Sequence, residues 1–135
     1  MKRLIAMVLC LLFVISLAGC GKGNTKNLVI DYGTSSIYTK DDMDEAIDVI
    51  KKQFGSFEGC ELHSLSYTSD DACNNEDNIA WMNELEEEND NKENFTQCIS
   101  FDSSFMSPKN GGGAWNANEE YTWSWWLARS EGGTW

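Results

Sequence analysis

The sequence predicts an α+β domain in which helices pack on an antiparallel sheet. Two observations predict it. Apolar residues between positions 43 and 54 recur at helical spacing, which is typical of an amphipathic helix. Three later segments, at 60–67, 95–105 and 120–129, have the composition or the alternation of strands. A chain of 135 residues has room for one such domain.

The first helix is predicted over Lys40–Phe54. Thr39 is a good N-cap, and Asp42 stands at the third helical position, so the pair forms a capping box. Gly55 ends the helix. Acids in its first turns and lysines in its last turn complement the helix dipole. Its buried face is predicted to consist of Met43, Ala46, Ile47, Ile50 and Phe54.

The next predicted elements are a strand at Cys60–Tyr67, an acid-rich loop and a second helix. The loop contains Asp70, Asp71, Asn74, Asn75 and Asp77. A calcium site of the EF-hand type is excluded because the loop lacks the glycine and the glutamate that its spacing requires. Asn75 is expected to cap the second helix, whose apolar side consists of Ile79, Met82 and Leu85. The glutamates from position 84 to 88 are expected to face water.

Two strands are predicted in the second half of the chain. In Phe95–Phe105 and in Glu120–Arg129, apolar and polar residues alternate. The sequence between them, 108–113, has three glycines and is predicted to be a loop. In the last strand Tyr121, Trp123, Trp125 and Leu127 are expected on the core side, and Trp126 on the other side.

The end of the sequence resembles the start of a β-hairpin. Ser130–Gly133 is predicted to be a tight turn, which would make Trp135 the second residue of a returning strand. We therefore expect that a terminal strand is missing. At the other end of the domain, Leu28–Ile30 is expected to form either an edge strand or a turn of helix.

A short leader precedes the domain. Met1-Lys2-Arg3 is basic, and Leu4–Leu17 is an apolar run too short to span a bilayer comfortably. Leu17, Ala18, Gly19 and Cys20 then resemble the bacterial lipoprotein processing signal. This resemblance implies cleavage before Cys20, a lipid on that cysteine and a location at the outer face of a membrane. The alternatives are an uncleaved membrane anchor and a secreted protein in which Cys20 has no role.

The resulting domain organisation has three parts. Residues 1–19 are the predicted signal peptide, 20–27 the lipidated cysteine with a flexible tether, and 28–135 a single α+β domain. Removing the leader takes the formal charge from −12 to −14, because it carries two basic residues and no acid. A chain this acidic repels nucleic acids and anionic head groups, so we do not expect either as a main partner. We expect a membrane contact only through the lipid.

Cysteine and histidine offer few candidates for chemistry. Cys60, Cys73 and Cys98 remain after lipidation, and one disulfide plus one free thiol is expected, with the pairing open. A zinc site is disfavoured because there is no CxxC motif and His63 is the only histidine. We expect no metal and no cofactor.

Several stretches resemble a group of uncharacterised bacterial lipoproteins. They are 32–39, 59–62, Trp125-Trp126-Leu127-Ala128-Arg129 and Gly132-Gly133-Thr134-Trp135. The ending is also similar to that of nuclear-transport-factor-2-like and cystatin-like domains. This resemblance implies a cone in which a long helix packs on a strongly bent antiparallel sheet, with ligands held at the open mouth. It implies no activity and no site residues.

Three functions are compatible with these features. A surface-anchored binding or accessory domain is favoured by the predicted anchor, the acidic surface and the lack of catalytic pairs, so we expect no enzyme. The first alternative is a small enzyme that uses His63 as a general base. The second is binding of cell-wall carbohydrate through exposed tryptophans such as Trp115 and Trp126.

Overall fold

The protein folds around one four-stranded sheet. The computed structural model describes residues 22–88 and 94–135. The strands are β1 (Val29–Asp31), β2 (Glu61–Tyr67), β3 (Gln97–Met106) and β4 (Glu120–Arg129), and they lie in that order across the sheet. The helices are α2 (Lys40–Phe54), α3 (Asp70–Cys73) and α4 (Glu76–Glu88). The predicted α+β class is therefore confirmed.

The sheet is mixed rather than wholly antiparallel. β2 with β3 and β3 with β4 are antiparallel, whereas β1 runs parallel to β2, with Ile30 opposite Leu65. The parallel pair follows from the connection, because α2 lies between β1 and β2 and carries the chain back across the sheet. For Leu28–Ile30 the sequence predicted either an edge strand or a turn of helix, and the segment contributes to an edge strand.

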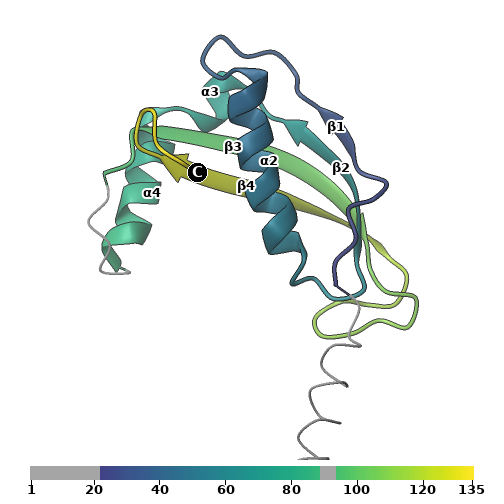
Figure 1. The fold of residues 1–135 in the computed structure, drawn as a ribbon. Coiled ribbons are helices and arrows are strands. Elements are labelled where there is room, and N and C mark those ends of the chain that lie inside the picture. Colours follow the sequence, from purple (N-terminus) through teal and green to yellow (C-terminus); the bar gives the residue numbers. More distant parts are fainter. Residues whose placement is uncertain (1–21, 89–93) are drawn as a thin grey trace, which may run out of the picture.

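Figure 1 shows how the layers are arranged. The sheet is curved, and α2 crosses one face of it. α4 lies at one end of β3 and β4, and the described chain begins near the opposite end, beside the loop that joins these strands. Within the described ranges, no helix has both the length and the apolar character that a membrane crossing requires.

Helix α2 has the predicted bounds, and its start is fixed by the predicted capping box. The Thr39 hydroxyl accepts a hydrogen bond from the Asp42 backbone N–H at 3.1 Å. The Asp42 carboxylate in turn accepts one from the Thr39 N–H at 2.9 Å. These bonds satisfy donors that the first turn of a helix leaves unpaired. The five apolar residues predicted for its inner face are all buried.

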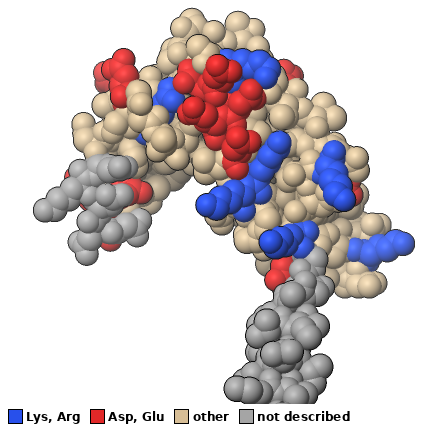
Figure 2. Space-filling model, in the orientation of Figure 1, with Lys and Arg blue, Asp and Glu red and all other residues tan. Residues whose placement is uncertain are grey.

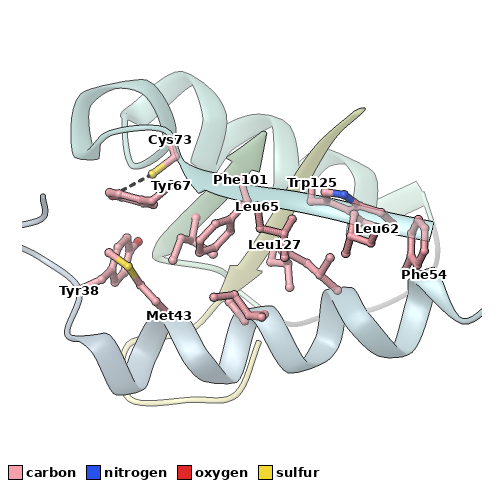
Figure 3. Close-up of a cluster of buried hydrophobic side chains, with 14 of the residues drawn as sticks. Tyr38, Met43, Phe54, Leu62, Leu65, Tyr67, Cys73, Phe101, Trp125 and Leu127 are labelled. Atoms are coloured by element: carbon pink, nitrogen blue, oxygen red, sulfur yellow. Dashed lines mark hydrogen bonds between the residues drawn. The ribbon is translucent and has the colours of Figure 1, made fainter. Parts of the chain in front are cut away.

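The main core lies between α2 and the sheet. Figure 3 shows side chains of α2 pointing toward those of the three longer strands. Its fully buried members from the sheet include Leu62, Leu65, Ile99, Phe101 and Phe105. On β4, Trp125 and Leu127 are buried on this face, as predicted. Trp123 is on the same face but is 47% exposed, because α2 ends at Phe54. The rings of Phe57 and Trp115, from the loops, lie edge-on to it.

The opposite face of the sheet is also covered near the start of β3. Cys98 and Ser100 are fully buried there. Trp126, which was predicted to lie on this side, packs edge-on against Trp81 of α4, with ring centroids 5.9 Å apart. Helix α4 itself has no buried residue, and its contact with the sheet is shallow.

Two segments depart from the sequence predictions. Residues 70–73 were predicted as a loop but form one helical turn, because the Ser69 hydroxyl caps it by accepting from the Ala72 N–H. Trp135 was predicted to be the second residue of a returning strand, but it does not pair with β4. After the turn at 130–133, its indole N–H donates to the Asp42 carbonyl at 2.9 Å, and its ring packs on Arg129.

Candidate functional site

A groove of about 530 Å³ lies beside β4. Three elements and the last residues of the chain form it. Most of the side chains that line it are apolar, although polar atoms contribute almost half of its surface, and its volume is in the range of ligand sites. The residues that line it are Val49 of α2, Met82 and Glu86 of α4, Phe95, Trp126, Leu127 and Ala128, and Ser130, Gly133, Thr134 and Trp135.

One wall of the groove is the free edge of β4. The carbonyls of Glu119 and Arg129 accept from backbone N–H groups on the β3 side, so odd-numbered residues of β4 bond to β3. In an antiparallel strand the backbone N–H and C=O groups of alternate residues point in opposite directions, so those of the even-numbered residues point away from β3. For Thr122, Ser124, Trp126 and Ala128 the described part of the chain supplies no backbone partner. The groove therefore combines apolar walls with unpaired strand groups.

Sequence reasoning found part of this site. It identified Trp126 as a candidate for ligand contact, but not the contributions of Val49 and Phe95. Val49 is 40% exposed and lies outside the apolar stripe of α2. Only its position beside β4 makes it part of the groove, and no signal in the sequence places a helix residue next to a strand so far along the chain.

His63 lies away from the groove, on a bulge of β2. Its Nδ1 is 3.4 Å from Glu120 and its Nε2 is 3.6 Å from Glu61, and its side chain is 37% exposed. Carboxylates are thus near, but more than a third of the side chain is open to solvent, so water reaches the ring. This arrangement does not favour the enzyme alternative, since a general base acts on a substrate held next to it.

The two tryptophans named for sugar binding are half-buried. Trp115 contacts Phe57, Phe105, Tyr121 and Trp123, with centroids 5.0 to 6.4 Å apart. Its ring is therefore part of an aromatic cluster rather than an open stacking platform. Trp126 lines the groove, and its neighbour Trp81 is 43% exposed. Carbohydrate binding therefore remains an alternative for the groove through Trp126, whereas the position of Trp115 does not favour it.

The three cysteines are buried and unbridged. The expected disulfide is not formed in this structure. Cys60 precedes β2, whereas Cys73 and Cys98 lie beyond its other end, so Cys60 is far from both. The Cys98 N–H donates to the side chain of Asn74 at 3.0 Å, which places Cys98 near α3. Burial raises the pKa of the Cys98 thiol to about 12, so it is protonated at neutral pH.

Asp70, in the acid-rich segment, holds the loop that precedes α2. The Asp70 carboxylate accepts hydrogen bonds from the hydroxyls of Ser35, Ser36 and Tyr67 and from the Ser36 N–H, at 2.5 to 3.0 Å. Burial acts against ionisation, but these bonds outweigh it and lower the pKa of Asp70 to about 2. In the two described ranges no group of three or more candidate ligands is placed to hold a metal ion.

Leu17, Ala18, Gly19 and Cys20 lie outside the described residues, as does the predicted signal peptide. Of the predicted tether at 20–27, the structure describes residues 22–27. Some of these residues form hydrogen bonds to the folded domain. Gly23 donates its N–H to the Gly55 carbonyl at 3.2 Å. Asn24 bridges to β2, accepting from the Leu62 N–H at 2.8 Å. The segment that separates Cys20 from the domain is therefore shorter than predicted.

Comparisons with protein-family models, with curated proteins and with solved structures find no match for this chain. Its function must therefore be argued from its own residues.

Proposed function

We propose that the protein is a bacterial extracytoplasmic lipoprotein, held at the cell membrane through lipid on Cys20. The observation that carries this proposal is the sequence Leu17-Ala18-Gly19-Cys20, placed directly after a basic and then apolar leader. Acyl chains on one residue anchor a protein well when there are at least two of them. The folded domain begins within a few residues of Cys20, since Gly23 already bonds to it.

The lipid anchor is tested by replacing Cys20 with serine in the full-length chain, expressed in a bacterial host. We expect the unchanged protein to incorporate radiolabelled fatty acid and to sediment with membranes. The Cys20→Ser chain should incorporate no label, because serine has no thiol to alkylate. Cys10→Ser is the matched control, because it removes the other leader cysteine and should change neither result. Labelling of Cys20→Ser at the unchanged level would refute the anchor.

We further propose that the domain acts as a binding module, with the groove beside β4 as its site. The proposed ligand is an apolar group or an extended apolar segment. Apolar walls favour such a group, and the free backbone groups of Ser124 and Trp126 can pair with an added strand. Glu86 at the rim favours a ligand that is neutral or cationic. The cystatin-like cone also remains a proposal, supported by one long helix that crosses a curved sheet (Figure 1).

The groove is tested with Nile red, a neutral apolar dye whose fluorescence rises when it leaves water. Val49→Asp should weaken dye binding about tenfold, because it puts a charge on an apolar wall. Ile37→Asp is the matched control, since Ile37 is also 40% exposed but lies away from the groove. Equal dye binding by both variants, measured by fluorescence titration, would mean that the groove is not the site. A cell-wall glycan that competes with the dye would instead favour the carbohydrate alternative.

A further inference from the structure

The chain enters the folded domain at a fixed point. Gly23 lies so close to the end of α2 that an added Cβ would stand 2.0 Å from the Phe54 carbonyl oxygen. Together with the backbone bonds to Gly55 and Cys60, this contact fixes the start of the domain against the last turn of α2 and the first residue of β2. Cys20 is three residues earlier, a span of at most about 11 Å. A lipid on Cys20 therefore brings this end of the domain to the bilayer surface.

Lysines surround this entry point. Lys22 and Lys26 belong to the entering segment, and Lys51 and Lys52 occupy the last turn of α2, directly before Gly55. Lys109 is on the β3–β4 loop, which reaches the same place because Pro108 lies against Gly59. In Figure 2 the blue side chains gather around the point where the described chain begins. We name these five residues the lysine face.

The lysine face contrasts with the rest of this acidic protein. Carboxylates in its neighbourhood are Glu58, Glu61, Glu119 and Glu120, and Asp48 one turn before Lys52 on α2, so this end is close to neutral whereas the rest of the domain is strongly acidic. The remaining described acids lie elsewhere, many of them on α4 and in the first turns of α2. Figure 2 shows red over the first turns of α2. The two other described cations, Lys40 and Arg129, are at that far end and are paired with Asp44 and Asp42.

We infer that the lysine face is a membrane-contacting surface that binds the anionic head groups of the bilayer. This inference rests on the proposed lipid anchor, which places the face within reach of the head groups. Each lysine near an anionic membrane contributes about 1 kcal/mol of attraction, which falls off over roughly a Debye length. The acidic remainder is repelled by the same surface, so both effects turn the domain with its groove and α4 away from the membrane. The expectation that anionic head groups are excluded was based on net charge, which averages over the whole molecule and does not describe this face by itself.

The test uses residues 20–135 with Cys20→Ser, which contain every described element and have no lipid. Sedimentation measures binding to vesicles of phosphatidylcholine with about 30 mol% phosphatidylglycerol, and to vesicles of phosphatidylcholine alone. We expect binding to the anionic vesicles at low salt and its loss at about 0.3 M salt. Changing Lys22, Lys26 and Lys109 to glutamine should raise the half-saturating lipid concentration at least about tenfold. These lysines are exposed, so the variant should fold normally.

The matched control separates the lysine face from net charge. It adds Glu84→Gln, Glu87→Gln and Glu88→Gln on α4 to the triple lysine variant, which restores the net charge at the far end of the molecule. We expect it to bind as weakly as the triple variant. Recovery of binding, equal binding to both kinds of vesicle, or no binding to anionic vesicles at low salt would each overturn the inference. Because this chain has no lipid, these outcomes are independent of whether cells lipidate Cys20.

Discussion

Replacement of Phe105 by alanine is expected to lower the free energy of unfolding by about 3–5 kcal/mol, because it removes a large ring from a close-packed core. Phe105 is fully buried. Its ring lies 5.7 Å from Phe54 at the end of α2 and 5.1 Å from Trp115 on the β3–β4 loop. It also stacks on Tyr121 of β4 at 5.7 Å. One ring thus joins the helix, the loop and the edge strand.

The cost comes from two sources. Truncation removes the transfer free energy of an aromatic side chain, and the cavity that remains adds to the loss because rings held by three elements cannot collapse into it. Urea unfolding, followed by circular dichroism, measures the change. Val29→Ala is the control, because Val29 is 68% exposed and its loss should stay within about 0.5 kcal/mol. A loss below about 1 kcal/mol in Phe105→Ala would show that this cluster does not join the elements as described.

The sequence determines the long elements of this fold because their signals are local. The capping box of Thr39 and Asp42 and the apolar spacing up to Phe54 predict α2 with its observed bounds. The alternation in 120–129 predicts β4 equally well. Each of these signals lies within the element that it predicts, so no knowledge of the tertiary structure is needed.

The features that sequence reasoning missed depend on contacts between distant segments. Gly23 and Asn24 look like part of a flexible linker, yet they bond to Gly55 and Cys60. Trp135 looks like part of a returning strand, but its indole N–H donates to the Asp42 carbonyl in the first turn of α2, and its ring packs on the buried Arg129. The lysine face is also a tertiary feature, since Lys22, Lys52 and Lys109 are far apart in the sequence. Only the fold brings them together.

Replacement of Arg129 by methionine is expected to lower the free energy of unfolding by about 2–4 kcal/mol. The Arg129 side chain is 8% exposed, and one terminal nitrogen lies 3.0 Å from the Asp42 carboxylate. Its Nε donates to Gln97 at 2.8 Å, and its guanidinium lies 4.2 Å from the centre of the Trp135 ring. Methionine keeps most of the packing, so the loss reports the uncompensated polar groups of Asp42 and Gln97.

The matched control for this change is Lys40→Met. Lys40 pairs with Asp44 at 2.9 Å, but these side chains are 67% and 41% exposed. Both variants remove one positive charge that is paired with an aspartate of α2, so net charge does not distinguish them. Water screens the exposed pair, so its loss should cost much less than the loss of the Arg129 pair. Equal losses in the two variants, measured by urea unfolding at neutral pH, would show that burial does not strengthen the Arg129 pair.

The pH dependence of the Arg129 effect follows from Asp42. The Thr39 N–H and the Arg129 guanidinium both lower the pKa of Asp42, against the effect of burial. A carboxyl whose pKa is lower in the folded state stabilises the fold above its unfolded pKa of about 3.9 and loses that effect as the pH falls through the folded value. Arg129→Met weakens the lowering of the Asp42 pKa. The difference between the variant and the unchanged protein should therefore be full at neutral pH and shrink below about pH 4. A difference that stays constant down to about pH 2 would assign the loss to packing instead of the ion pair.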